Sequence, residues 1–349
     1  MTTALISVVI PAYNAEATVE ACLRSIFAQD IAVDLMEVIV IDDCSIDGTA
    51  SLMEMRPLRP NFRFLRNTSH FGASYSRNAG LREARGVWVT FVDADDELPQ
   101  NALRTLLRYG ESASVDLVVG AHVKKDPLGN AYLNRHGLHS GMSQPTNSLL
   151  EYVQLYCHEP YIYTLLVHCW GKLYRRAAVD RAEAWFDTRL QQLEDVNFNF
   201  KFLMHTNEIC YVDSPVYFHN VGRSSGMSSN SGREPESTRM MEVAYQPVSN
   251  FFVERCGRPS REAEKYTGHL VVTTCVVWLQ RLWRGAYNRS FQAILSDIDA
   301  ILSSRTLRDN LRYYTLMDRD SRAIYLSLFV RSKYLTAFSL GLNHLLGKK

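Results

Sequence analysis

Short apolar runs alternate with segments of helical periodicity over the first third of the chain. The amphipathic segments at residues 19–27 and 73–84 predict helices. The apolar runs that predict buried strands lie at residues 5–11, 38–41, 62–65, 87–92 and 117–119. Strands that alternate with helices favour a mostly parallel sheet covered on both faces, so we expect a Rossmann-like α/β fold.

The alternation weakens in the middle of the chain. Gly, Pro, Asn and His are scattered through residues 126–147, which predicts a loop-rich connection. Helical and irregular elements are expected to carry residues 170–174 and 194–203. A segment rich in Ser, Gly and Asn at residues 224–237 predicts a mobile linker. Mainly helical structure is expected from residue 239 onward.

These changes of pattern divide the chain into two expected domains, at residues 1–225 and 226–349, and the first divides again near residue 125. The chain has 349 residues, 46% of them apolar, which is enough to bury one or two cores. Charged residues make up 21% and the net charge is +1. This balance disfavours nucleic-acid binding, which is typical of strongly basic domains.

Cysteine usage and hydropathy indicate a cytosolic protein. The seven cysteines are odd in number and scattered, and no Cys-x-x-Cys occurs, so we expect reduced thiols and no disulfide framework or zinc site. No apolar run is long enough to cross a bilayer. The first eleven residues lack the basic lead of a secretory signal.

Polar side chains stand where the predicted strands end. In an open parallel sheet, ligands bind beyond the carboxyl ends of the strands. Carboxylates gathered on one edge of a sheet repel one another unless a cation or a donor-rich ligand binds there. The residues at these ends are Pro11, Tyr13 and Asn14 after the first strand, Asp42 and Asp43 after the second, and Asp93, Asp95 and Asp96 after the fourth.

The Asp93-Ala94-Asp95 group is the sharpest of these features. Carboxylate oxygens suit Mg²⁺ or Mn²⁺, which commonly bridge one or two carboxylates to substrate phosphates. A bare Asp-x-Asp is common, and the alternative is a solvated acidic turn that caps the next helix. Its position directly after a buried strand favours the metal site.

Several sequence blocks then occur in a fixed order. They are SVVIPAYNAEATVEACLRSI, VIVIDDCSIDGT, FGASYSRNAGL and GVWVTFVDADD, followed downstream by WGKLYRR, LEDVNFNFKFL and SPVYFHNVGRSS. Together they resemble the inverting family 2 glycosyltransferases of GT-A fold, in particular bacterial members that make capsule, lipopolysaccharide or exopolysaccharide. The resemblance covers residues 5–225. It implies a nucleotide-binding part at about 1–125 and an acceptor part at about 126–225.

The resemblance implies a donor site at the strand ends. Pro11 and Tyr13 would line the pocket for the base and ribose. Asp43 would accept a hydrogen bond from the uracil N–H, with Asp42 beside it. The donor would be a nucleotide sugar, expected to be a UDP-sugar.

Four further residues receive roles around the donor from the same resemblance. Arg77 and Asn78 would lie near the nucleotide. Asp93 would contact the ribose or the donor sugar. Asp95 would bind Mg²⁺ or Mn²⁺ under the diphosphate.

Asp195 is the expected catalytic base. Inversion at the anomeric carbon needs a carboxylate that takes the proton from the attacking acceptor hydroxyl. No covalent intermediate is required, so no Ser or Cys nucleophile is expected. The alternative for Asp195 is an acid that caps or stabilises the start of a helix.

Four other residues give a less specific signal, and three of them have two interpretations each. Trp170 stacks on a sugar or is a core residue. Lys172 contacts the diphosphate or the acceptor, or lies along a surface. His219 and Arg223 close over the phosphates from a loop, or His219 is an ordinary packed histidine.

Two residues after the paired aspartates depart from the family pattern. Cys44 stands where Gly is common, and Ile46 replaces a small or polar residue. The backbone at Cys44 must avoid positive φ or accept strain.

The tail combines basic and aromatic residues. No acidic residue follows Asp320, and residues 322–349 carry five Lys or Arg among Leu, Phe and Tyr. Such a stretch can lie on an anionic membrane, or it can pack as a helix with its basic residues in solvent. The first interpretation predicts a peripheral protein on the cytoplasmic face of the inner membrane, near a lipid-linked acceptor.

The preferred interpretation is an inverting transferase that moves a sugar from a nucleotide sugar to a glycan or lipid-linked acceptor in surface polysaccharide synthesis. A sugar-phosphate nucleotidyltransferase is disfavoured because PAYNAEAT is not a Gly-rich basic phosphate loop. A dinucleotide-dependent oxidoreductase would need Gly-x-Gly-x-x-Gly after the first strand. A non-catalytic sugar-nucleotide-binding scaffold would lack the base or metal ligand, whereas Asp95 and Asp195 are both present.

Overall fold

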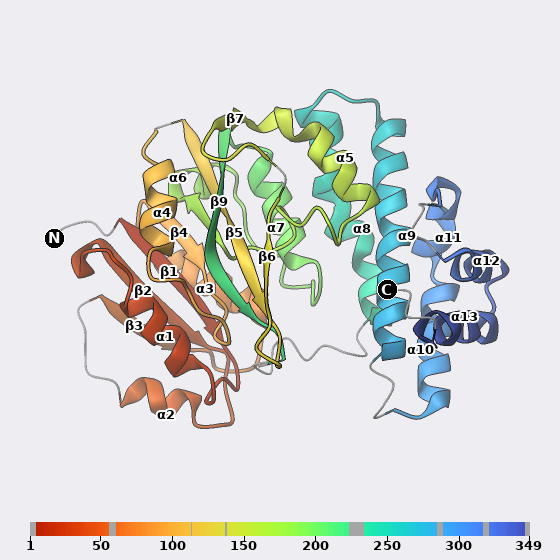
Figure 1. The fold of residues 1–349 in the computed structure, drawn as a ribbon, viewed down its shortest axis with the longest axis horizontal. Helices are drawn as coiled ribbons and strands as arrows, with labels where there is room; N and C mark the ends of the chain where they lie inside the picture. The colour runs from red at the N-terminus through yellow and green to blue at the C-terminus, as the bar shows by residue number, and fades with distance from the viewer. Residues whose placement is uncertain are drawn as a thin grey trace. The chain divides into compact units, whose positions relative to one another are not determined.

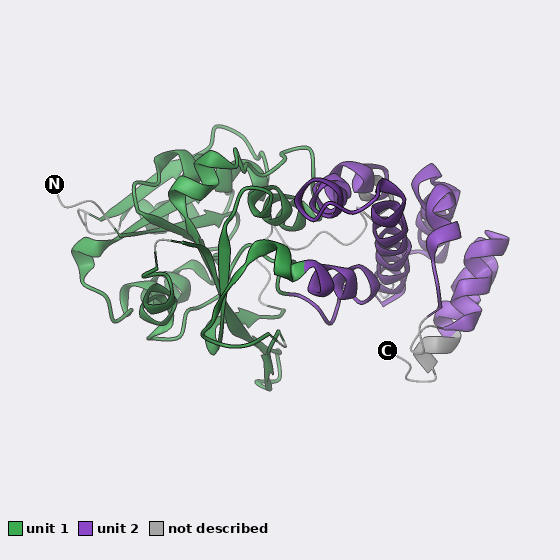
Figure 2. Cartoon of the chain, turned by 90° about the horizontal axis from the view of Figure 1, so that it is seen from above, with its two compact units in different colours: residues 1–149, 165–229 green, residues 150–164, 230–349 purple. Residues whose placement is uncertain are grey.

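The computed structural model describes residues 5–55, 61–112, 114–136, 138–222, 234–284, 289–316 and 321–345. The chain forms two compact units (Figure 2). The first comprises residues 1–149 and 165–229, and the second comprises residues 150–164 and 230–349. The sequence-based division at residue 225 keeps the helix α5 (Leu150–His158) with the first unit, whereas its contacts group it with the second.

Four parallel strands form the first half of the sheet in the order β3-β2-β1-β4 (Figure 1). They are β1 (Ile6–Ala12), β2 (Met36–Asp42), β3 (Phe62–Arg66) and β4 (Trp88–Phe91). These are the first four strands that the apolar runs predict. Because the strands are parallel, the polar residues that follow β1, β2 and β4 come to the same edge of the sheet.

The sheet continues from β4 in the order β8-β5-β9-β7, with β6 paired to β5. The strand β8 is antiparallel to both neighbours, and β5 and β9 are parallel. The prediction of helical or irregular structure at 170–174 was wrong, because β8 occupies this position. The bounds are β5 (Val115–Lys125), β6 (Ala131–Asn134), β7 (Ser143–Pro145), β8 (Lys172–Arg175) and β9 (Glu208–Asn220).

Helices cover both faces of this sheet, as the alternation predicts. Val8 and Ile10 of β1 belong to the core that includes α1 and α4. Val9 points to the other face, where a side chain at Gly80 of α3 would collide with it. The helices of this unit are α1 (Val19–Phe27), α2 (Thr49–Glu54), α3 (Ala73–Glu83), α4 (Ala102–Tyr109), α6 (Arg176–Arg181) and α7 (Glu194–Leu203).

The second unit is mainly helical, as expected from residue 239 onward. A π-helical turn at Phe251–Arg255 follows α8. The described helices include none with the length and apolarity that a membrane span requires. The predicted linker at 224–237 lies largely outside the described residues. Besides α5, the helices are α8 (Glu234–Asn250), α9 (Ser260–Arg284), α10 (Phe291–Ser303), α11 (Arg305–Asn310), α12 (Arg322–Val330) and α13 (Lys333–Leu345).

Candidate active site

Two loops at the ends of β1 and β2 hold each other in place. The amide of Asn14 donates to Ser45 Oγ over 2.9 Å, and the amide of Ile46 donates to Asn14 Oδ1 over 3.0 Å. Asn14 and Cys44 both have positive φ, of 48° and 62°. Cys44 therefore adopts the left-handed conformation that a glycine would adopt without strain. The cross-loop hydrogen bonds hold this unfavourable backbone conformation.

Asp42 and Asp43 are fully buried, and each carboxylate has protein partners. Asp42 Oδ2 lies 3.1 Å from Nε of Arg66. Asp43 accepts from the amide of Gly72 at 2.7 Å and from Nδ2 of Asn67 at 2.7 Å. Burial of a carboxylate is costly unless it is hydrogen-bonded. These contacts therefore make Asp43 the anchor of the loop that follows β3.

Tyr13 lies at the same edge and stacks on a histidine that sequence reasoning missed. Its ring centroid is 4.0 Å from that of His70, with 26° between the planes. His70 Nδ1 is also 2.8 Å from Asp43 Oδ2. Pro11, at the end of β1, is buried and pairs with Ile41 of β2. The region predicted to hold the base and ribose is thus lined by rings and by Asp43.

Arg77 joins the end of β4 to the start of α7. Its guanidinium lies 3.0 Å from Asp93 Oδ1, 3.0 Å from Asp195 Oδ1 and 3.3 Å from Glu194 Oε1. Burial opposes the charge of Arg77, but the influence of Cys169 and of these three carboxylates outweighs it and raises the pKa of Arg77 well above its ordinary value. Because one planar cation contacts all three carboxylates, Asp93 and Asp195 must face the same small volume.

Asp195 sits in the first turn of α7 but does not cap it. No side chain caps this helix, whose N-cap residue is Leu193, with a φ of 66°. Asp195 instead accepts from the amide of Cys169 at 3.0 Å through Oδ2, and its side chain is 14% exposed. Each carboxylate oxygen can accept a second hydrogen bond. Asp195 is therefore oriented by two donors and still reachable from the site.

Glu194 and Asn78 make further contacts around Arg77 and Asp195. Burial and the neighbouring charge of Asp195 raise the pKa of Glu194, while Arg77 acts against this shift. Asn78 is buried and exchanges two hydrogen bonds with the backbone of Phe186, of 2.8 and 2.9 Å. In this structure Asn78 thus joins α3 to the segment before α7, and its predicted contact with the nucleotide stays a prediction.

Of the three aspartates after β4, Asp95 and Asp96 differ in exposure. Asp96 is buried and accepts from Tyr217 Oη at 2.8 Å and from the amide of Asn220 at 2.7 Å. Asp95 is partly exposed. Among the described residues, no three His, Cys, Asp or Glu side chains group closely enough to cage a metal ion. The donor set of Asp95 and Asp93 fits Mg²⁺ or Mn²⁺ whose remaining ligands are phosphate oxygens and water.

Trp170 is a core residue. It is buried, and His168 and Tyr217 each stack on it with centroids 4.3 Å away and planes within 9°. Two rings at this distance must lie on opposite faces of the indole, so neither face is left for a sugar. His219 Nδ1 lies 3.3 Å from Asp96 Oδ2 at the end of β9. Arg223 lies outside the described residues.

Lys172 occupies the first position of β8 and is buried. Its ammonium donates to the carbonyl oxygens of His168 and Trp170. Burial lowers its pKa to about 8, against the opposing effects of Cys169 and, at longer range, of Asp195. Its predicted contact with the diphosphate or the acceptor stays a prediction.

The structure therefore brings Arg77, Asp93 and Asp195 together directly and places Asp43 on the same edge of the sheet. Sequence reasoning missed Asn67, His70 and Glu194. A signal for the first two was available, since they follow β3, whose carboxyl end reaches this edge too.

A mostly parallel sheet with carboxylates at its strand ends, and a further acid held near them, is the arrangement of the GT-A fold. The family model for glycosyl transferase family 2 matches residues 7–181, half of the chain, and the chain belongs to this family.

Curated relatives are glycosyltransferases by name. The poly(ribitol-phosphate) beta-N-acetylglucosaminyltransferase TarS of Staphylococcus aureus is 26% identical over 324 residues, which cover 90% of this chain and 54% of TarS. The uncharacterized glycosyltransferase EpsJ of Bacillus subtilis is 25% identical over 251 residues, covering 72% of this chain and 67% of EpsJ. The chain thus spans about half the length of TarS.

Solved structures share the fold. The crystal structure of a TarS fragment from S. aureus in complex with UDP-GlcNAc has a TM-score of 0.67 at 17% identity and covers 99% of this chain and 92% of that chain. The mannosyltransferase PcManGT from Pyrobaculum calidifontis, in complex with GDP-Man and Mn²⁺, has a TM-score of 0.50 at 17% identity. It covers 100% of this chain and 89% of that chain.

Proposed function

We propose that this protein is an inverting glycosyltransferase that moves a sugar from a UDP-sugar to a glycan or lipid-linked acceptor in bacterial surface polysaccharide synthesis. Family membership supports the reaction class. The names of its relatives support a nucleotide-sugar donor and a polymer acceptor, since TarS is named for poly(ribitol-phosphate) and was crystallised with UDP-GlcNAc. The observation that carries the proposal is the contact of Arg77 with both Asp93 and Asp195.

The donor lies along the edge formed by the ends of β1, β2 and β4. Tyr13 and Asp43 bind the base, and the diphosphate extends toward Asp93 and Asp95. These two aspartates would hold Mg²⁺ or Mn²⁺, which neutralises the charge on the departing diphosphate. In this structure His70 stacks on Tyr13 and pairs with Asp43. Its side chain must therefore move away when the base binds.

Asp195 takes the proton from the acceptor hydroxyl as that oxygen attacks the anomeric carbon. Arg77 and the amide of Cys169 hold the two carboxylate oxygens in a fixed orientation. The acceptor must therefore approach the side of the carboxylate that these donors leave open. A positioned general base of this kind contributes on the order of 100- to 10,000-fold to the rate.

The test is UDP release from a panel of UDP-sugars with Mn²⁺, measured for the wild type and for Asp195→Asn. We expect the rate to fall on the order of 1,000-fold, while the affinity for UDP, measured by calorimetry, stays within about twofold. Asp187→Asn is the matched control, because Asp187 is an acid of the same segment that pairs with Arg189. Full turnover by a folded Asp195→Asn variant would remove Asp195 from the mechanism.

The second unit carries an exposed apolar surface on its last two helices, and we propose that this surface contacts an anionic membrane. Its basic neighbours Arg322, Arg331 and Lys333 match anionic headgroups, and apolar side chains of this kind insert at the lipid boundary. A lipid-linked acceptor gives this contact a purpose. The apolar side chains are those of Leu326, Phe329, Val330, Tyr334, Leu335 and Phe338, the last of them 68% exposed.

Co-sedimentation with phosphatidylglycerol-containing vesicles tests this contact. We expect the double variant Phe329→Ser/Phe338→Ser to lose at least 10-fold in vesicle binding. Phe291→Ser is the control, since Phe291 is an exposed phenylalanine of α10 in the same unit. Equal binding by the double variant and the wild type, or equal binding to neutral vesicles, contradicts the proposal.

A further inference from the structure

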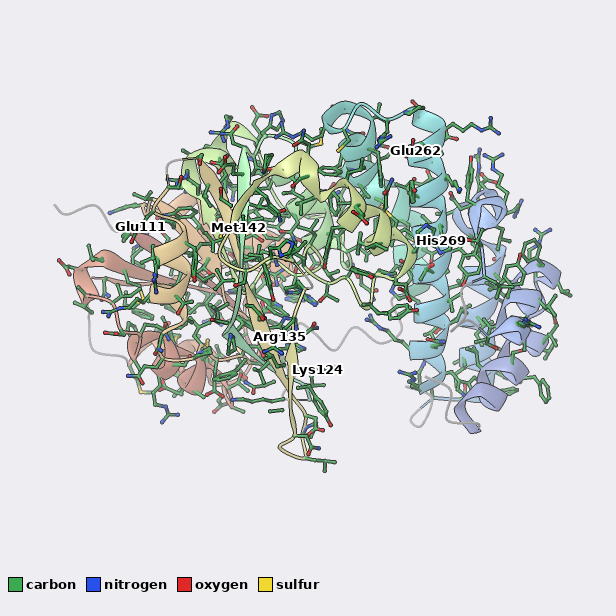
Figure 3. The ribbon with its side chains drawn as sticks, turned by 45° about the horizontal axis from the view of Figure 1, so that its top comes forward. Glu111, Lys124, Arg135, Met142, Glu262 and His269 are labelled. Atoms are coloured by element: carbon green, nitrogen blue, oxygen red, sulfur yellow. The ribbon has the colours of Figure 1, made fainter. Side chains whose placement is uncertain are left out.

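A group of cationic and potentially cationic side chains has no role in the reaction described so far. We name it the histidine–lysine cluster; its members are His122, His136, His168 and Lys172. The ring of His122 lies 5.8 Å from that of His136 and 6.3 Å from that of His168, between centroids. The antiparallel pair of β5 and β6, marked by Lys124 and Arg135 in Figure 3, brings His122 and His136 together.

Lys172 is a buried cation that lacks an anionic partner. It is 3% exposed, and its ammonium donates only to the carbonyl oxygens of His168 and Trp170. Within the described ranges, no carboxylate oxygen lies within 4.0 Å of it. Lysine is almost never fully buried without a paired charge, because removal of an ammonium from water is costly. Lys172 therefore marks a place where an anion is expected.

His136 adds an independent sign of a missing ligand. It is 6% exposed, and its buried Nδ1 has no hydrogen-bond partner in the described part of the chain. Burial and the charge of Lys172 lower the pKa of His136 to about 3 and that of His122 to about 4. The surrounding charges that act on His122 are those of Lys172, His219 and Lys124, all positive. Each neutral imidazole still offers one N–H to an anion.

The cluster adjoins the proposed base on the side away from the nucleotide pocket. In the sheet, β1, β2 and β3 lie on one side of β4, whereas β8 and β5 lie on the other. His168 directly precedes Cys169, whose amide binds Asp195. A ligand of the cluster therefore reaches the site from the acceptor side.

We propose that the histidine–lysine cluster binds a phosphate group of the acceptor, beside the hydroxyl that Asp195 deprotonates. This inference rests on the proposed function. One ammonium and three imidazoles from separate segments match the several acceptor oxygens of a phosphate better than the two oxygens of a carboxylate. The one other source of phosphate is the diphosphate of the donor, and the experiment must distinguish the two.

Histidine NMR on the full chain, saturated with UDP and Mg²⁺, makes this distinction with inorganic phosphate as the probe. We expect phosphate to shift the Hε1 resonances of His122 and His136 and to raise their titration midpoints by about one pH unit or more. Sodium chloride at matched ionic strength should have no such effect. Lys172→Met should abolish the shift, whereas Lys201→Met should keep it, because Lys201 is a half-buried lysine that also binds a carbonyl oxygen.

Three outcomes overturn the inference. Phosphate that shifts these resonances only when UDP is absent belongs to the donor site. An absence of any shift removes the cluster as a phosphate site. A shift that survives in a folded Lys172→Met variant removes Lys172 from it. UDP affinity measured on the same sample tests the proposed function separately: absence of UDP binding contradicts that function, whereas absence of the phosphate shift contradicts only the cluster.

Discussion

The acidic and the basic halves of the site differ in how their charges are compensated. On the acidic half, each of the buried aspartates 42, 43 and 96 has protein donors, and Arg77 contacts three carboxylates at once. On the basic half, the partners that the described residues give Lys172 are two neutral carbonyl groups. Both halves belong to one compact unit.

This difference shows which parts of the site are preformed. A carboxylate held by fixed donors keeps its position before any substrate arrives, which lowers the cost of reorganisation in the reaction. A buried cation with only neutral partners destabilises the free protein and is relieved when an anion binds. The acidic half is therefore the fixed frame, and the basic half is the part whose stability depends on a ligand.

The largest expected effect comes from removal of the cation of the acidic half. Arg77→Met leaves three carboxylates without their shared partner, so the free energy of unfolding should fall by about 3–5 kcal/mol. Urea denaturation at pH 7 measures this change. Arg104→Met is the control, because Arg104 pairs with Asp30 in solvent and should change stability by less than about 1 kcal/mol. Equal effects of the two variants would show that the contacts of Arg77 with the three carboxylates do not contribute to stability.

On the basic half, removal of the cation should raise the free energy of unfolding instead of lowering it. Burial lowers the pKa of Lys172 from 10.5 to about 8, so the folded state loses stability as the pH falls from 10.5 to 8, and this cost is fully present below pH 8. Lys172→Met removes this cost and loses two hydrogen bonds to carbonyls, and the free energy of unfolding should rise by about 1–2 kcal/mol at pH 7. Thermal and urea unfolding measure it, with Lys124→Met, an exposed change, as the control. Strong destabilisation by Lys172→Met would contradict the contrast between the halves.

A further effect concerns the dependence of stability on pH. His122 and His136 have folded-state pKa values below 6.5, so the unfolded chain binds more protons as the pH falls. Their contribution to stability is present above pH 6.5 and is lost toward pH 4. Each histidine should lower the free energy of unfolding by about 2 kcal/mol at pH 5 relative to pH 7.

Urea unfolding at these two pH values tests this effect in the wild type and in His122→Asn/His136→Asn. The double variant should show a smaller difference between the two pH values, and phosphate should reduce the difference in the wild type. An unchanged pH dependence in the double variant would show that His122 and His136 do not cause the loss of stability at low pH.

Much of the first half of the fold follows from local pattern. Buried strands leave continuous β-branched runs, and the strand-end rule then places Tyr13, Asp43 and Asp93 on one edge without any knowledge of the structure. The sequence pattern did not predict the strand β8. It has only four residues, it is antiparallel, and Lys172 is buried in it, so its sequence carries neither an apolar run nor a clear alternation.

The amino-acid pattern was sufficient to predict the class of fold, the polar residues at the strand ends and the family of the chain, because these depend on short-range periodicity and on ordered sequence blocks. The three-dimensional structure was needed to show that one guanidinium, Arg77, connects residues more than a hundred positions apart. It also decided that Trp170 is packed on both faces and that Lys172 lacks a counter-ion. Charge compensation depends on distances across the fold, and no local pattern in the chain encodes those distances.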